Sequence, residues 1–153
     1  MKQKYTEGTW FSIPLESGKF AVGVVARKTP RRGRVLFGYF FGPARIKKPV
    51  LSDLSDYRPT DAVGKWIFGD LGLINGRWPI IGEFDGWDRT NWAMPVFVRN
   101  DPLAKTSYEV EYIDDDPNGA VTKTRIPFDP NPSNRDAMRG FGAVEIELGR
   151  LLQ

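Results

Sequence analysis

Three groups of charged residues in this sequence could do chemistry. The first is a set of carboxylates interleaved with aromatic residues: Glu83, Asp85 and Asp88, among Trp78, Phe84, Trp87 and Trp92. Two carboxyl groups about 5–10 Å apart in a cleft can hydrolyse a glycosidic bond, and neighbouring aromatic rings suit sugar binding. The same residues also suit a β-domain whose large side chains fill its core. Because the chain has 19 Asp and Glu residues, some such cluster is inevitable.

The second group is basic. Between Glu16 and Asp53 the chain has no acid, and its cations are Lys19, Arg27, Lys28, Arg31, Arg32, Arg34, Arg45, Lys47 and Lys48. Aromatic residues lie among them, a pattern typical of small barrels that bind nucleic acid through phosphate contacts and base stacking. The cations expected to form such a face are Arg27, Arg31, Arg32 and Arg34. Alternatively, the aromatic residues form the core face of the strands and the Arg-rich turn lies in solvent.

The third group is acidic and consists of Glu109, Glu111, Asp114, Asp115 and Asp116. Such a run can meet a positively charged partner, or it can pair with the basic residues of the same chain. The segment 114–119 also matches the first half of a calcium-binding loop. The twelfth position of that loop requires a glutamate, but Arg125 stands there, so we expect no metal site.

Two absences narrow the chemistry further. The chain has no cysteine and no histidine, which excludes disulfides, thiolate nucleophiles and Cys/His zinc sites. The side chain that most often acts as a general base near neutral pH is also missing. Any enzyme on this chain would therefore have to use carboxylates, lysine, tyrosine or a hydroxyl. Because the sequence has no catalytic motif built from these residues, we expect no catalytic residue and no cofactor. No apolar run approaches the ~18 residues of a membrane span, and the first residues do not form a signal peptide, so a soluble cytoplasmic protein is expected.

The elements that position these residues are predicted to be mainly β. The length of 153 residues indicates a single domain over 1–153, and 16 Gly and 12 Pro divide it into short segments. We expect a curved antiparallel sheet or a small, partly open SH3-like barrel, with one or two short C-terminal helices. Residues 7–100 form the β core in this interpretation, and residues 101–153 form an acidic hairpin and a short helical tail.

Alternating apolar residues and turn residues predict the individual strands. The predicted strands are Thr9–Leu15, Phe20–Ala26, Arg34–Phe41, Val63–Phe68, Arg77–Gly82 and Pro95–Arg99. The first three form a meander, and residues 42–62 form a loop with one helical turn at Leu51–Tyr57. Pro79 and Pro95 favour edge or terminal strand positions, because proline cannot donate to the ladder.

The clearest local pattern is a hairpin of Tyr108–Ile113 and Ala120–Ile126. The sequence Asp116-Pro117-Asn118-Gly119 predicts its turn. With a three-residue loop, Glu111 faces Arg125 or Lys123 across the strands; with a two-residue loop it faces Thr124. Such an ion pair would account for part of the acidic and basic pattern without any function.

One or two short helices are predicted after the hairpin. Ser133 is a plausible N-cap with Asp136 three residues on, and Gly140 could end that helix. In the tail, Val144, Leu148, Leu151 and Leu152 follow helical spacing. Val144, Ile146 and Leu148 also alternate as in a strand, but the helix is favoured.

Three blocks of the chain resemble the immunity protein 26 family. The first is Glu7–Leu15 (EGTWFSIPL) followed by Ser17–Val25 (SGKFAVGVV), and the others are Gly76–Gly82 (GRWPIIG) and Pro95–Phe97 (PVF). The resemblance covers roughly residues 7–100. It implies a cytoplasmic bacterial protein of a polymorphic toxin system that binds one toxin domain tightly and blocks it, without catalysis of its own.

The resemblance does not say which surface would bind the toxin. If the toxin has a basic cleft, the candidate toxin-binding residues are Glu109, Glu111, Asp114, Asp115 and Asp116. If the toxin is acidic, the basic stretch from Arg27 to Lys48 is the candidate. A small nucleic-acid-binding barrel is the alternative function, and a carbohydrate enzyme or lectin comes third.

Overall fold

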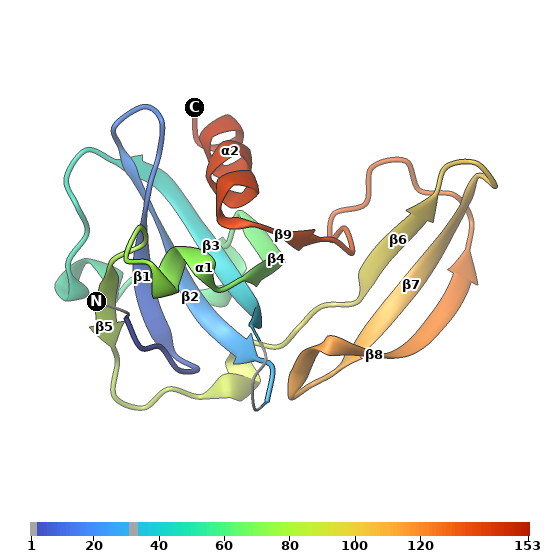
Figure 1. Cartoon of the computed structure of the whole chain (residues 1–153), viewed down its shortest axis with the longest axis horizontal. Coiled ribbons are helices and arrows are strands. Elements are labelled where there is room, and N and C mark those ends of the chain that lie inside the picture. The colour runs from blue at the N-terminus through green and yellow to red at the C-terminus, as the bar shows by residue number, and fades with distance from the viewer. Residues whose placement is uncertain (1–2, 31–33) are drawn as a thin grey trace.

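The computed structural model, which describes residues 3–30 and 34–153, contains two β-sheets (Figure 1). The larger has the order β5-β1-β2-β3-β4-β9 and the smaller the order β6-β7-β8. The strands are β1 (Thr9–Pro14), β2 (Phe20–Lys28), β3 (Val35–Arg45), β4 (Gly64–Gly69), β5 (Ile80–Glu83), β6 (Phe97–Asp101), β7 (Thr106–Ile113), β8 (Asp116–Ile126) and β9 (Met138–Arg139). The helices are η1 (Leu51–Leu54), η2 (Pro59–Asp61), α1 (Leu71–Ile74), η3 (Arg89–Asn91) and α2 (Phe141–Leu151).

The predicted meander is confirmed as β1, β2 and β3, which pair antiparallel, and β4 continues the sheet. Among the strands of the described residues, only β4 and β9 pair in parallel, and Val98 and Arg135 form an isolated parallel bridge. The prediction of a mainly β fold with a short C-terminal helix is confirmed. Within the described residues the larger sheet does not close into a barrel, because β5 and β9 end it on opposite sides.

The central strands are apolar on both faces because both faces of the larger sheet are covered. On one face Phe11, Phe40, Phe68 and Trp78 pack together, and Val144 and Leu148 of α2 close over them. On the other face the core consists of Trp10, Val22, Val24, Ala26, Phe37, Tyr39, Phe41, Leu54, Ile67, Trp92 and Phe97. Burial on both faces explains the near-continuous hydrophobic runs in β2 and β3.

The prediction of a C-terminal helix is confirmed by α2, which buries Val144 and Leu148. The prediction of a second helix at Ser133–Gly140 is wrong. Residues 134 and 136 bond instead to β6: the Val98 amide donates to the Asn134 carbonyl at 2.8 Å, and the Asp136 amide donates to the Val98 carbonyl at 2.8 Å. The Asp136 carboxylate accepts from side chains of the smaller sheet, so it is not available to cap a helix.

No helix in the described part of the chain is both long and apolar enough to span a bilayer. The longest is α2, with 11 residues. The predicted helical turn at Leu51–Tyr57 is present as η1. Pro79 immediately precedes β5, and Pro95 lies two residues before β6 begins. Both strands are edge strands of their sheets, in agreement with the prediction for proline.

The smaller sheet packs on the larger one through aromatic edges. Phe97 of β6 meets Phe37 of β3 at a ring-centroid distance of 6.0 Å and Tyr112 of β7 at 5.6 Å, both nearly perpendicular. The Tyr112 hydroxyl donates to the Asp136 carboxylate, which also pairs with Arg99 at 2.5 Å. Burial, then the adjacent Asp136 carboxylate, raise the pKa of Tyr112 to about 12.

The close approach of β2 and β3 predicts the effect of a single methyl group. A Cβ at Gly38 would lie 2.7 Å from the Val24 carbonyl oxygen and 2.9 Å from the Phe68 ring. Gly38→Ala is expected to lower the free energy of unfolding by about 1–3 kcal/mol, because an overpacked core cannot relax freely. Gly69→Ala at the end of β4, where a Cβ meets nothing within 4 Å, is the matched control. Urea denaturation of both variants measures the difference, and equal stabilities would contradict this packing.

The raised pKa of Tyr112 predicts a pH dependence. The folded protein favours the protonated phenol, so the contribution of Tyr112 is fully present below pH ~10, the ordinary tyrosine pKa. It is lost as the pH rises toward the folded value of about 12. Tyr112→Phe is therefore expected to be less stable than the wild type at pH 8, and the difference should shrink between pH 10 and 12. Denaturant midpoints at pH 8, 10 and 11 test this; a difference that stays constant would contradict it.

Candidate functional site

The predicted hairpin is present as β7 and β8, but its turn is not where the sequence placed it. Ile113 pairs with Asp116, so the turn consists of Asp114 and Asp115. The prediction of a turn at Asp116–Gly119 is wrong: this segment belongs to β8. Between the pairs Ile113–Asp116 and Glu111–Thr122, β8 has more residues than β7, and shifts of register on both sides of Tyr112 accommodate the excess.

The hairpin presents Glu109 and Glu111 on one exposed face. Glu109 pairs with Thr124 and Glu111 with Thr122, whose hydroxyl donates to the Glu111 carboxylate at 3.0 Å. Neither predicted arrangement of Glu111 is correct, because the turn lies earlier in the chain than predicted and the register shifts beside Tyr112. Lys123 and Arg125 lie opposite Val110 and Tyr108 instead, and alternation along a strand puts them on the other face of the sheet.

Arg27 is the side chain that anchors the hairpin turn to the larger sheet. It lies on β2 and is 1% exposed. Its Nε donates to the carbonyl oxygen of Asp114 at 2.9 Å and its Nη2 to the Asp114 carboxylate at 3.0 Å. The remaining N–H groups donate to the carbonyl oxygens of Ala26 at 2.6 Å, Trp92 at 3.3 Å and Arg89 at 3.2 Å. Every nitrogen of the guanidinium thus has a partner, as a buried charge requires.

Arg89 of η3 extends this anchor to the surface. It pairs with Glu7 at 2.7 Å, Asp114 at 3.3 Å and Asp115 at 2.8 Å. The hydrogen bond to Glu7, and then the contact with Asp115, raise the pKa of Arg89 above its ordinary value. Two cations therefore balance most of the negative charge at the turn. The sequence analysis missed Arg89 and Glu7 because their partners are far away along the chain and no spacing connects them.

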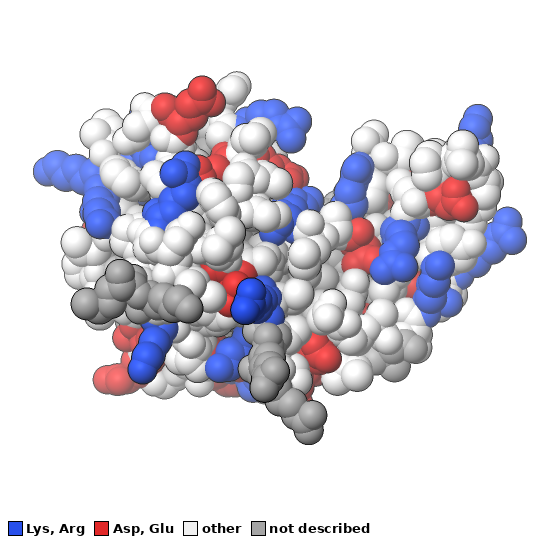
Figure 2. Space-filling model, in the orientation of Figure 1, with Lys and Arg blue, Asp and Glu red and all other residues white. Residues whose placement is uncertain are grey.

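Of the four residues predicted to form a basic face, the structure describes Arg27 and Arg34. Arg27 is buried and fully bonded, so it cannot contact an exposed phosphate; this part of the prediction is wrong. Arg31 and Arg32 lie outside the described residues, and Arg34 is exposed. On the face drawn in Figure 2, acidic and basic side chains are interspersed, without one large field of either sign.

The carboxylates among aromatic residues take part in packing and turn formation. Trp87 stacks on Trp92 at 5.3 Å, and both line a cavity of about 320 Å³ on the second core face. The Asp88 carboxylate accepts from the hydroxyl and backbone N–H of Thr90, which lowers the pKa of Asp88. The Glu83 carboxylate accepts a hydrogen bond from the Thr9 hydroxyl at 2.9 Å. Local hydrogen bonds therefore account for Glu83 and Asp88, whereas Asp85 is exposed and lines the cavity. Among the described residues, no three of the Asp and Glu side chains group as metal ligands.

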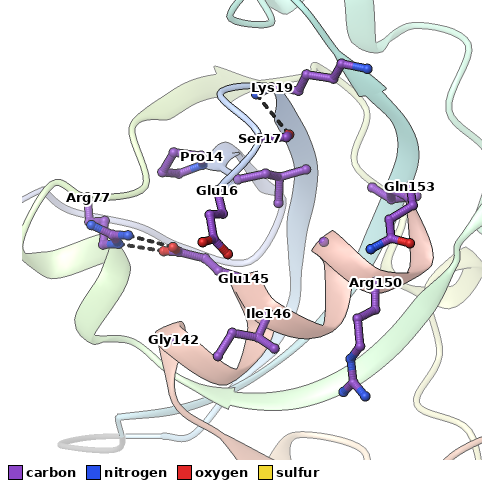
Figure 3. A pocket seen from close by; sticks show the side chains of 13 residues that line it. Pro14, Glu16, Ser17, Lys19, Arg77, Gly142, Glu145, Ile146, Arg150 and Gln153 are labelled. Atoms are coloured by element: carbon purple, nitrogen blue, oxygen red, sulfur yellow. Dashed lines mark hydrogen bonds and ion pairs between the residues drawn. The ribbon is translucent and has the colours of Figure 1, made fainter.

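A groove of about 730 Å³ lies between the β1–β2 turn and α2 (Figure 3). The turn contributes Glu16 and Lys19, and the helix contributes Ile146 and Arg150. At one end Arg77 and Glu145 form two hydrogen bonds of 2.6 Å, visible as dashed lines in Figure 3. The sequence analysis predicted both flanking elements but not the groove, because its walls are more than a hundred residues apart in the chain.

The comparisons with known proteins place this arrangement in a class. A family model matches residues 6–109, which is more than half of the chain, and it describes an immunity protein family. The chain belongs to that family, immunity protein 26, as the three sequence blocks predicted. The match covers β1 to β6 and the first part of β7; β8, β9 and α2 lie beyond it. No curated protein and no solved structure matches the chain.

The anchor made by Arg27 predicts a large effect of one substitution. Arg27→Met keeps the approximate size of the side chain but removes the Arg27 donors from four carbonyl oxygens and from the Asp114 carboxylate. We expect a loss of about 3 kcal/mol in the free energy of unfolding. Lys28→Met is the matched control, since the neighbouring residue is exposed and a surface substitution changes stability by about 0.5 kcal/mol or less. Denaturant unfolding compares the two; equal losses would show that Arg27 is not the anchor.

Proposed function

We propose that this protein neutralises a toxin by binding directly to the toxin's functional domain. Membership of the immunity protein 26 family is the observation that carries this proposal. The proposed setting is the cytoplasm of a bacterial cell with a polymorphic toxin system. Binding requires no chemistry from the immunity protein, because a protein that covers a catalytic cleft stops substrate from entering.

The β7–β8 hairpin is the proposed contact surface for a toxin with a basic cleft. Glu109 and Glu111 are exposed on one face, and Asp115 at the turn is exposed as well. The buried contacts of Arg27 hold the turn in place, so the hairpin loses little conformational freedom on binding. Negative side chains presented in this way attract a basic surface and speed association.

The acidic residues of the hairpin have different roles in this proposal. Asp114 accepts from the buried Arg27 and supports the fold. Asp116 is half-buried and accepts from the amide of Asn118 at 2.9 Å. Glu109 and Glu111 have no ion-pair partner among the described residues. Substitutions at these two glutamates therefore test binding with little effect on the fold.

The experiment starts from the toxin encoded next to this gene. Cells that express the toxin are expected to survive when they also express this protein, and the two proteins should co-purify in fixed stoichiometry with the toxin inactive. Glu109→Lys/Glu111→Lys is expected to slow association about tenfold at low salt, because like charges replace complementary ones. Association is measured by stopped-flow or surface plasmon resonance.

The matched control is Glu16→Lys/Asp56→Lys. It makes the same change in net charge at two exposed acids away from the hairpin. An equal effect of both double variants would assign the change to net charge rather than to the hairpin. A wild-type protein that neither binds nor protects against the neighbouring toxin would overturn the proposed function itself.

A further inference from the structure

The two sheets have four outer edges, and three of them are short or covered. β5 has four residues, pairs irregularly with β1, and lies against Leu51 of η1 at Gly82. β9 has two residues. The outer side of β6 is occupied by residues 134–136 through the two backbone hydrogen bonds at Val98. Each of these edges offers little room for a further strand.

The fourth edge is β8, which has 11 residues and no strand beyond it among the described residues (Figure 1). Its first part is irregular, but the segment from Thr122 to Ile126 pairs with β7 without any shift of register. Residues 122–125 are all exposed. In a regular edge strand, alternate residues turn their N–H and C=O groups outward, so this segment presents unpaired backbone donors and acceptors.

The side chains of this segment have an alternating chemistry. Lys123 and Arg125 share one face, and the Lys123 ammonium lies 4.3 Å from the centre of the Tyr108 ring. Neither cation has an ion-pair partner among the described residues. Thr122 and Thr124 occupy the other face. The free edge therefore combines two unpaired positive charges with uncharged hydroxyl groups in strict alternation.

This pattern disfavours a second copy of the same strand. If two β8 strands paired antiparallel around Thr124, Lys123 of each copy would lie opposite Arg125 of the other. Like charges directly opposite in an antiparallel pair are destabilising. A strand with acidic residues at alternate positions has the complementary pattern, because its carboxylates would face Lys123 and Arg125.

We propose that β8 accepts an extended, alternately acidic segment of the toxin as a fourth strand of the smaller sheet. The identity of the partner rests on the proposed function; the chemistry of the edge does not. β8 lies outside the residues matched by the family model, so it is available to carry recognition that belongs to this chain. Main-chain hydrogen bonds give such a complex its affinity, and the side-chain alternation gives it selectivity.

The first test uses the whole protein and a synthetic peptide with alternating glutamates, acetyl-Thr-Glu-Val-Glu-Thr-Glu-Val-amide. In NMR titrations of the labelled protein, we expect the peptide to shift the amides of Thr122–Ile126 and to slow their hydrogen exchange. The same peptide with lysine in place of glutamate is expected not to bind. Two further peptides carry N-methyl groups at odd or at even positions, and only one of them should bind, because only alternate amides face β8.

The second test reverses the charge of the edge. Lys123→Glu/Arg125→Glu is expected to lower the affinity for the glutamate peptide about tenfold or more, since two attractive cross-strand pairs become repulsive. The same variant is expected to bind the lysine peptide. Lys19→Glu/Arg150→Glu, which makes the same change in net charge at exposed residues of the groove in Figure 3, should leave both peptides unaffected. Thermal unfolding confirms that each variant is folded.

The outcomes separate this proposal from the proposed function. Failure of the glutamate peptide to bind, shifts outside β8, or equal binding of both N-methylated peptides would overturn strand addition, whatever the toxin does. Peptide binding together with a wild-type protein that gives no protection would leave the edge site standing and remove the toxin as its occupant. Full protection and unchanged toxin affinity in Lys123→Glu/Arg125→Glu would show that the toxin does not use this edge.

Discussion

The guanidinium of Arg27 connects the two sheets of this protein. It is buried on β2, and its hydrogen bonds reach the β5–β6 connection and the β7–β8 turn. A buried charge without partners is very unfavourable, so the surrounding chain must keep its carbonyl oxygens in place. The aromatic contacts between Phe37, Phe97 and Tyr112 hold the same interface by packing. The orientation of the hairpin, and thus of every residue proposed to meet a partner, depends on this anchor.

The features that the sequence predicted well are those set by neighbours along the chain. Apolar runs between turn residues located β1 to β4, and helical spacing located α2, because both patterns reflect local burial. The turn of the hairpin was misplaced because Pro117 and Gly119 are strong turn residues locally, whereas the contacts of Asp114 with Arg27 and Arg89 fix the turn two residues earlier. Those contacts join residues 87 and 25 positions apart, and no local pattern reports them.

The candidate site illustrates the same limit for charged residues. Arg27 belongs to a basic stretch in the sequence, but the fold buries it, whereas Glu109 and Glu111 belong to an acidic stretch and remain exposed. The tryptophans beside Asp85 and Asp88 stack on one another and fill the second core. Strand register and contacts between distant segments decide whether a charged or aromatic side chain faces the surface or the interior. The amino-acid composition carries no information about either.

The chemistry of the anchor also affects how this chain can change over evolutionary time. Four of the acceptors around Arg27 are main-chain carbonyl oxygens, from Ala26, Arg89, Trp92 and Asp114. Every amino acid supplies a carbonyl, so side chains at these positions can be exchanged without removing any of these four acceptors. The residues at the hairpin surface can then diverge together with the proposed toxin partner, while a single arginine keeps the hairpin in the same position.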